Sequence, residues 1–217
     1  MKTFLQLPQF SQTTMKSLSP IFVSIGITLF AHAAHAVEYG SVLADKSSVS
    51  FTSRQMGVPV QGGFPKFTTK LSFDPSKPEA AKVELSIDLA TIDAGSKDAN
   101  DEVVGKQWFN VKMFPMATFT SNAVKSVGPG SYEVTGALTI KGKSIPVTAA
   151  FTYKTEGSNG VFDGGFTLKR IDFAIGEGPW ADVSTVANEI QVKFRVVAAA
   201  STAAAPATPA KPPAKTK

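Results

Sequence analysis

KVELSIDLATI, residues 82–92, alternates between two kinds of side chain. One parity carries the apolar residues Val83, Leu85, Ile87 and Leu89, and the other carries Lys82, Glu84, Ser86 and Asp88. Successive side chains of a β-strand point to opposite faces of the sheet. The stretch therefore predicts a strand with one dry face and one wet face.

The same period of two recurs along much of the chain. We expect strands within residues 48–53, 66–73, 82–92, 117–124, 131–140, 144–153, 161–175 and 188–197. Glycine and proline turn signals separate them, and Lys141-Gly142-Lys143 predicts a tight hairpin. Sequential antiparallel strands with one apolar face close as a sandwich or as a barrel. Because the strands are long and their turns short, an all-β, antiparallel, eight-stranded barrel is favoured over a sandwich.

One segment, residues 97–110, breaks the alternation and predicts a short helical insertion. Asp98 is the expected N-cap, Asp101 and Glu102 fall in the first turn, and Gly105 ends the helix.

The two ends of the chain differ from its middle. Residues 1–36 combine Lys2 and Lys16, an apolar run at 21–30 and a small-residue site ending at Ala36, which is typical of a signal peptide. The apolar run is too short for a membrane-spanning helix. Residues 198–217, rich in Ala, Pro and Lys, predict a disordered tail. The folded domain is therefore expected at 37–197, in the periplasm.

Charge argues against a nucleic-acid partner. The formal net charge is +5, but the leader contributes two lysines and the tail three, so the remaining domain is neutral. It has no basic stripe with interleaved aromatics. Lys211, Lys215 and Lys217 of the tail leave open a weak contact with an anionic envelope surface.

The residue types that the chain lacks exclude several kinds of catalytic and metal-binding chemistry. The chain has no cysteine, and both histidines, His32 and His35, lie in the leader. We therefore expect no catalytic residue, no metal site and no cofactor. Carboxylates at Asp93, Asp98, Asp101 and Glu102 suit helix capping better than a glycosidase pair. Asp163, Asp172 and Asp182 lack the close spacing of a calcium loop.

Two features point to a ligand site. QWFNVKMFPMATF, residues 107–119, gathers Trp108, Phe109, Phe114 and Phe119, which either pack as core under a loop or line the opening of a barrel. Arg170 lies in an otherwise apolar stretch. It is either a surface residue at a strand edge or a pocket residue that meets a polar or anionic head group.

Four fragments in order resemble the YceI-like family of exported polyisoprenoid-binding proteins with a lipocalin-like barrel. They are VSFTSRQMGVPVQGGFPKFTTKLSFDP, DEVVGKQWFNVKMFPMATFTS, VTGALTIKGKSIPV and RIDFAIG. The resemblance spans residues 48–197. This chain departs from the family at Val103, where a histidine is common, and at Ala174, where a glycine is common.

The resemblance implies an apolar lumen that holds an isoprenoid lipid, either a prenyl pyrophosphate or a quinone-like molecule, with Arg170 near its polar end. The residues expected to bind it are Phe51, Phe67, Phe73, Leu85, Leu89, Trp108, Phe109, Phe114, Phe119, Leu138, Phe151, Arg170 and Phe173. The expected role is that of a carrier or sequestering protein rather than an enzyme.

Three alternatives stay open at this point. One is an enzyme that uses Asp98, Asp101 and Asp172 on lipid or sugar. The second is an outer-membrane barrel with its apolar faces turned outward. The third is a structural β-domain with a filled centre that displays its tail to a partner. A homodimer also stays open.

Overall fold

The computed structural model describes residues 37–202. The predicted signal peptide, residues 1–36, and residues 203–217 of the predicted tail lie outside the described residues. Both assignments stay predictions.

The described chain consists mostly of strands. The ten strands are β1 (Val37–Val42), β2 (Ser48–Gln55), β3 (Val58–Gly63), β4 (Phe67–Ser72), β5 (Lys82–Asp88), β6 (Met116–Gly128), β7 (Ser131–Ile140), β8 (Lys143–Glu156), β9 (Asn159–Lys169) and β10 (Glu189–Thr202). There is one α-helix, α1 (Lys97–Val103). The 3₁₀ turns are η1 (Ala44–Lys46), η2 (Pro78–Ala80), η3 (Leu89–Thr91), η4 (Arg170–Phe173) and η5 (Gly178–Ala181).

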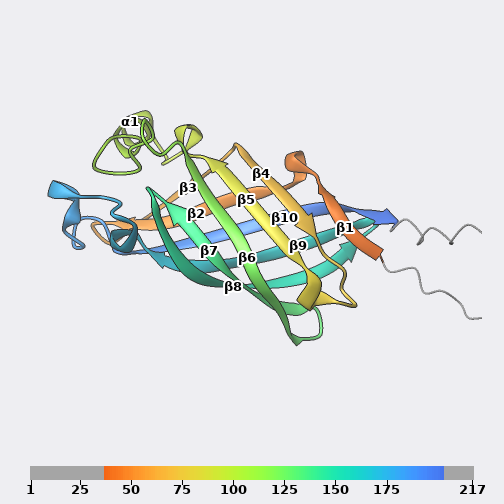
Figure 1. Cartoon of the computed structure of the whole chain (residues 1–217). Coiled ribbons are helices and arrows are strands. Elements are labelled where there is room, and N and C mark those ends of the chain that lie inside the picture. The colour runs from red at the N-terminus through yellow and green to blue at the C-terminus, as the bar shows by residue number, and fades with distance from the viewer. Residues whose placement is uncertain (1–36, 203–217) are drawn as a thin grey trace, which may run out of the picture. The chain divides into compact units, whose positions relative to one another are not determined.

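All strands belong to one curled antiparallel sheet, with the order β3-β2-β10-β9-β8-β7-β6-β5-β4 and with β1 on β10 (Figure 1). Strand β10 is long enough to pair with β2 along its first half and with β1 along its second. The backbone N–H of Tyr39 in β1 donates to Phe73 O at 2.9 Å, and Phe73 N–H donates to Tyr39 O at 3.1 Å. Because Phe73 directly follows β4, these two bonds join the two sides of the sheet. The predicted all-β, lipocalin-like barrel is confirmed.

The apolar parity points into the barrel. In β5, Ile87 is buried whereas Lys82 and Glu84 are exposed. In β7, Tyr132, Val134, Leu138 and Ile140 are all buried. Removal of apolar surface from water drives this inward orientation. It is the reverse of the orientation that the outer-membrane alternative requires.

The sequence missed two strands and misplaced several strand ends. The expected strand at 82–92 ends at Asp88, because Leu89 begins the turn η3. Strand β3 contains Pro59 and ends in two glycines, which weaken a strand signal, and β1 is short. The expected strand at 161–175 ends at Lys169, because Arg170 begins the turn η4. Strand β10 runs to Thr202, so Ala198–Thr202, assigned to the tail, pair with β1 instead.

The predicted helix exists but begins with a different cap. The side chain of Ser96, not of Asp98, accepts a hydrogen bond from Ala99 N–H at 3.2 Å. Asp98 lies in the first turn, where a carboxylate favours the positive end of the helix dipole. The helix ends at Val103, two residues before Gly105, where it was expected to stop, and the rest of the 97–110 insertion consists of turns.

The tight hairpin between β7 and β8 is confirmed. Ile140 pairs with Lys143, which leaves Lys141 and Gly142 as a two-residue loop. Their φ angles are +50° and +75°. Positive φ at both central residues is the requirement of a type I′ turn, which matches the twist of the flanking strands.

At position 174, where the resemblance implies a glycine, the backbone has a conformation that favours glycine. Ala174 follows η4 with φ +55°, in the left-handed region. A residue with a Cβ, other than Asn or Asp, pays a steric penalty there of roughly 1–2 kcal/mol.

We therefore expect Ala174→Gly to raise the free energy of unfolding by about 1 kcal/mol, because relief of this strain exceeds the added entropy of the unfolded chain. Urea denaturation measures the change. Ala150→Gly, on the exposed face of β8, is the control and should lower stability. A loss of stability in both variants would contradict the assignment of strain to Ala174.

Candidate functional site: a hollow barrel

The barrel contains two cavities, and the larger one has a volume of about 540 Å³. Most of its lining is apolar. The polar and charged lining residues are Ser53, Gln55, Ser96, Asp98, Glu102 and Arg170. Gln55, Ser96, Asp98 and Glu102 are exposed to solvent and belong to the end of β2 and to the start and body of α1. The cavity therefore opens between α1 and the β2–β3 hairpin.

A smaller cavity of about 130 Å³ lies further along the barrel, towards the Tyr39–Phe73 closure. Of its lining residues only Thr69 is polar, and its hydroxyl oxygen is buried with no hydrogen-bond partner among the described residues. Aromatic side chains close this end of the barrel; they are Tyr39, Phe73, Tyr132, Phe151, Tyr153 and Phe162. Burial raises the pKa of Tyr153 to about 12, so its hydroxyl is neutral in this cluster.

Inward-facing glycines make room for the cavities. A Cβ on Gly136 would lie 2.5 Å from the Cζ of Phe119, and a Cβ on Gly164 would lie 2.6 Å from the Cζ of Phe194. Both distances are far below contact. The end of each phenyl ring therefore lies over a glycine, in space that any other side chain would fill. This arrangement keeps the centre of the barrel hollow.

Two connections are tied together across the end of the larger cavity. In Figure 1, α1 and the segment between β9 and β10 (blue) both lie at that end of the strands. The carbonyl of Gln107 accepts from the N–H groups of Gly176 at 2.9 Å and Glu177 at 2.8 Å. The indole N–H of Trp180 donates to Glu102 Oε1 at 2.8 Å. The connections thus form a single cover over the cavity.

Arg170 is buried inside this cover and bonds to its backbone. Its side chain is 1 % exposed, and it has no carboxylate partner among the described residues. Its five N–H groups donate instead to five carbonyl oxygens, at 2.7 to 3.1 Å; these belong to Ile175, Gly176, Trp180, Val186 and Ala187. The guanidinium also lies over the Trp108 ring, 5.8 Å from its centroid. Burial lowers the pKa of Arg170, but an arginine keeps its charge at any physiological pH.

Neither of the two interpretations of Arg170 from the sequence, as a surface residue or as a pocket residue that binds a head group, describes it fully. It is not a surface residue, and it borders the larger cavity as a pocket residue would. However, an arginine has only five donor N–H groups, and the loops use all of them. Arg170 can offer a ligand its positive field but no free hydrogen bond.

The predicted ligand residues fall into three groups. The larger cavity is lined by Phe51, Leu89, Trp108, Phe109, Leu138 and Arg170. The smaller cavity is lined by Phe73, Leu85, Phe119, Leu138 and Phe151. Phe67, Phe114 and Phe173 line neither cavity. Contact of the lining residues with a ligand stays a prediction.

The three outlying phenylalanines have other packing partners. Phe114 packs over Gly142 of the β7–β8 hairpin. Phe173 is 2 % exposed and, with the partly buried Phe67, packs in the core. The four aromatic residues of 107–119 thus have two kinds of environment. Trp108, Phe109 and Phe119 face cavities, whereas Phe114 packs against a turn.

Sequence reasoning also missed lining residues. Phe166, Val192 and Phe194 share the inward parity of β9 and β10, so the alternation contained a signal for them. Trp180 and Val186 come from the segment between those strands. That segment has no periodicity, and nothing in the sequence marks which of its side chains turn inward.

The carboxylates of the enzyme alternative do not share one site. Asp98 borders the opening of the larger cavity, whereas Asp101 forms an exposed ion pair with Lys97. Asp172 is exposed and lines neither cavity. Within residues 37–202, no group of three or more His, Cys, Asp or Glu side chains could hold a metal ion. No helix in this range is long and apolar enough to cross a membrane.

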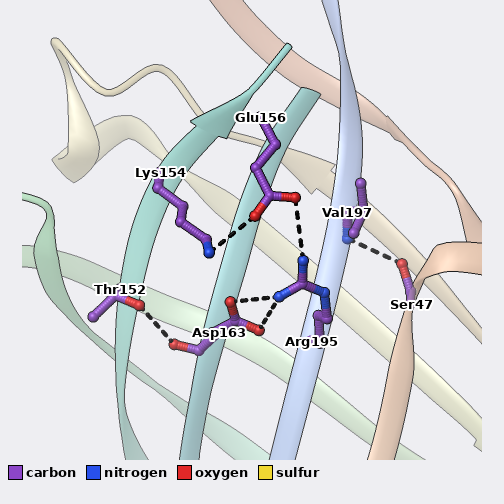
Figure 2. Close-up of polar contacts among 7 residues, drawn as sticks. All are labelled: Ser47, Thr152, Lys154, Glu156, Asp163, Arg195 and Val197. Carbon is purple, nitrogen blue, oxygen red and sulfur yellow. Dashed lines mark hydrogen bonds and ion pairs between the residues drawn. The ribbon is translucent and has the colours of Figure 1, made fainter. Parts of the chain in front are cut away.

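A second arginine provides a contrast to Arg170. Arg195 lies on the outside of β10, with its side chain 38 % exposed. Its Nη1 donates to both carboxylate oxygens of Asp163, at 3.0 and 2.8 Å, and its Nη2 contacts Glu156 Oε2 at 3.3 Å (Figure 2). Lys154 pairs with the same glutamate at 2.9 Å. This is a solvated ion-pair network across β8, β9 and β10.

A curled antiparallel barrel with an apolar cavity that opens at one end defines a class of small-ligand-binding β-barrel proteins. Comparison with known families narrows the class. Residues 41–198 match the model of the YceI-like domain, and the chain belongs to this family.

Individual relatives agree with the family assignment. A UPF0312 protein of Ectopseudomonas mendocina is 32 % identical over 159 residues, which cover 70 % of this chain and 83 % of the relative. The crystal structure of BcnA from Burkholderia cenocepacia has a TM-score of 0.71 at 45 % identity and covers 72 % of this chain and 99 % of its own. A polyisoprenoid binding domain from Saccharophagus degradans, at 15 % identity, shares the fold with a TM-score of 0.56, over 76 % of this chain and 99 % of its own.

Arg170 and Arg195 are expected to contribute differently to the free energy of unfolding. Arg170→Met leaves several buried carbonyl groups without a donor, each of which costs about 1–3 kcal/mol, so we expect a loss of at least about 3 kcal/mol in the free energy of unfolding. Arg195→Met removes only exposed ion pairs and should cost about 1 kcal/mol or less. Urea denaturation compares the two variants. Similar losses would contradict a special structural role of Arg170.

Proposed function

We propose that this protein holds an isoprenoid lipid inside its barrel and acts as a periplasmic carrier or sequestering protein. The observation that carries the proposal is the apolar cavity of about 540 Å³, which opens between α1 and the β2–β3 hairpin. The third alternative, a solid β-domain, requires a filled centre. The family relationship adds support, because one structural relative is described as a polyisoprenoid binding domain.

The energetics of burial favour an oily tail. Each methylene-sized group contributes about 0.8 kcal/mol, so one five-carbon prenyl unit contributes roughly 3–4 kcal/mol before the cost of ordering the chain. A few units therefore suffice for tight binding. The polar residues gather at the opening, so the head group would lie there and the tail would lie deeper.

The charges at the opening favour an uncharged head group. Of the described residues that line the larger cavity, Arg170 is the only cation, and its donors are all used. Asp98 and Glu102 place two carboxylates beside the opening, and a diphosphate would face them both. The indole N–H of Trp108 is buried without an acceptor among the described residues, and a carbonyl or hydroxyl oxygen of a quinone or an alcohol would provide one.

Native mass spectrometry of protein purified without detergent tests the proposal. We expect a co-purified lipid whose fragments contain prenyl units. Spectra that repeatedly show only the bare polypeptide would count against a carrier or sequestering role.

Prenyl alcohols and prenyl diphosphates of equal tail length test the head-group preference. Both tryptophans of the chain, Trp108 and Trp180, line the larger cavity, so their fluorescence reports on its occupancy. We expect the alcohol to bind more tightly than the diphosphate, and the difference to shrink at high salt, because added ions screen the repulsion at the opening. Tighter binding of the diphosphate would contradict the neutral head group and leave the lipid-binding role intact.

A further inference from the structure

The two cavities meet at a belt of side chains that line both of them. Five residues line both cavities, and each comes from a different strand; they are Val49 of β2, Ile87 of β5, Leu138 of β7, Phe166 of β9 and Val192 of β10. Phe166 is the one aromatic residue of this belt, and it pairs across the sheet with Val192. The belt therefore lies at the boundary between the larger cavity and the smaller one.

The polarity of the two cavities gives a bound lipid one direction. All charged lining residues belong to the larger cavity, whereas the smaller cavity is apolar except for Thr69. A polar head group placed in the smaller cavity would lose its hydrogen bonds with water and gain almost none in return. The head group must stay near the opening, so only the far end of a tail can reach through the belt.

The volumes translate into numbers of prenyl units. At a share of roughly 30 Å³ for each water-sized group, the larger cavity of about 540 Å³ holds roughly 18 such groups, or three to four five-carbon units. By the same share, the smaller cavity of about 130 Å³ holds roughly four groups, or one unit. Beyond these, further units have no enclosed space and must leave through the opening.

We propose that the smaller cavity is a terminal subsite for the last prenyl unit, and that it sets the tail length at which affinity stops rising. This inference rests on the proposed function and adds a length preference to it. Tails of three units fill only the larger cavity. Tails of four to five units pass the belt and gain the burial of one more unit. Longer tails gain little more.

Ala149 allows the subsite to be filled without a change to the larger cavity. It lies on β8, is 4 % exposed, and lines the smaller cavity but neither the larger cavity nor the belt. Ala149→Leu adds three carbon atoms, which occupy most of the smaller cavity. Ala150→Leu is a matched control, because Ala150 is the next residue of the same strand and is exposed on the outer face.

Binding of prenyl alcohols with three, four and five units to the full chain, followed by quenching of tryptophan fluorescence, tests the proposal. For the unchanged protein, we expect affinity to rise by about tenfold or more between three and five units. Ala149→Leu should leave the three-unit Kd unchanged and weaken the five-unit Kd by about tenfold or more, so that the length dependence disappears. Ala150→Leu should retain it.

The outcomes separate the length preference from the lipid-binding role. An equal loss at every length in Ala149→Leu, or an unchanged length dependence, would overturn the terminal subsite alone. Absence of binding of every alcohol to the unchanged protein would overturn the proposed function, and the subsite with it. Melting temperatures identify a variant that fails to fold, and Ala149→Val, which adds two carbons, then replaces Ala149→Leu and should weaken only the longest tail.

Discussion

The hollow of this protein depends on how its sheet closes. Two backbone hydrogen bonds between Tyr39 and Phe73 join β1 to the chain that follows β4. With the sheet closed, every inward side chain must share the same interior, and their summed volume decides whether that interior is full. Phenylalanine rings that lie over Gly136 and Gly164 leave part of it empty. Closure and these wall glycines together produce a cavity instead of a packed core.

A buried guanidinium holds the other end of the barrel. Arg170 donates hydrogen bonds to carbonyl oxygens of the segment between β9 and β10 and so holds that segment in one shape. Gln107 and Glu102 bond the same segment to the connection that contains α1. Neither connection has regular structure over most of its length, so these bonds replace the ladder of a sheet. The same contacts consume the hydrogen-bonding capacity of the cation. The arginine that looked suited to an anionic head group therefore serves the cover of the cavity.

The interior has a gradient from polar to apolar that matches an amphiphile. Charged and polar side chains border the opening, the middle is apolar, and the far end is sealed by a cluster of aromatic side chains. Burial of a flexible tail needs no specific bonds along its length, because the hydrophobic effect is proportional to area and has no direction. Selectivity then comes from what limits the tail, namely the width of the belt and the space beyond it.

Alternation along the sequence is enough to predict the class of fold and the inward face of most strands. Strict alternation, as at residues 82–88, leaves only one orientation that buries the apolar parity. The sequence also marked Trp108, Phe109 and Phe119 as a group, and it placed the tight hairpin at Lys141 and Gly142. It overlooked β1 and β3, since short or proline-containing strands are stabilised by their neighbours rather than by their own pattern.

The rest of the site depends on contacts that form only when the chain is folded. The roles of Trp180 and Val186, the loss of Phe67, Phe114 and Phe173 from the lining, and the saturation of Arg170 all follow from contacts between segments far apart in the chain. The division of the interior by five residues from five strands is of the same kind. Periodicity tells which way a side chain points, but only closure of the sheet sets how far it stands from the side chains opposite, and that distance separates a cavity from a core.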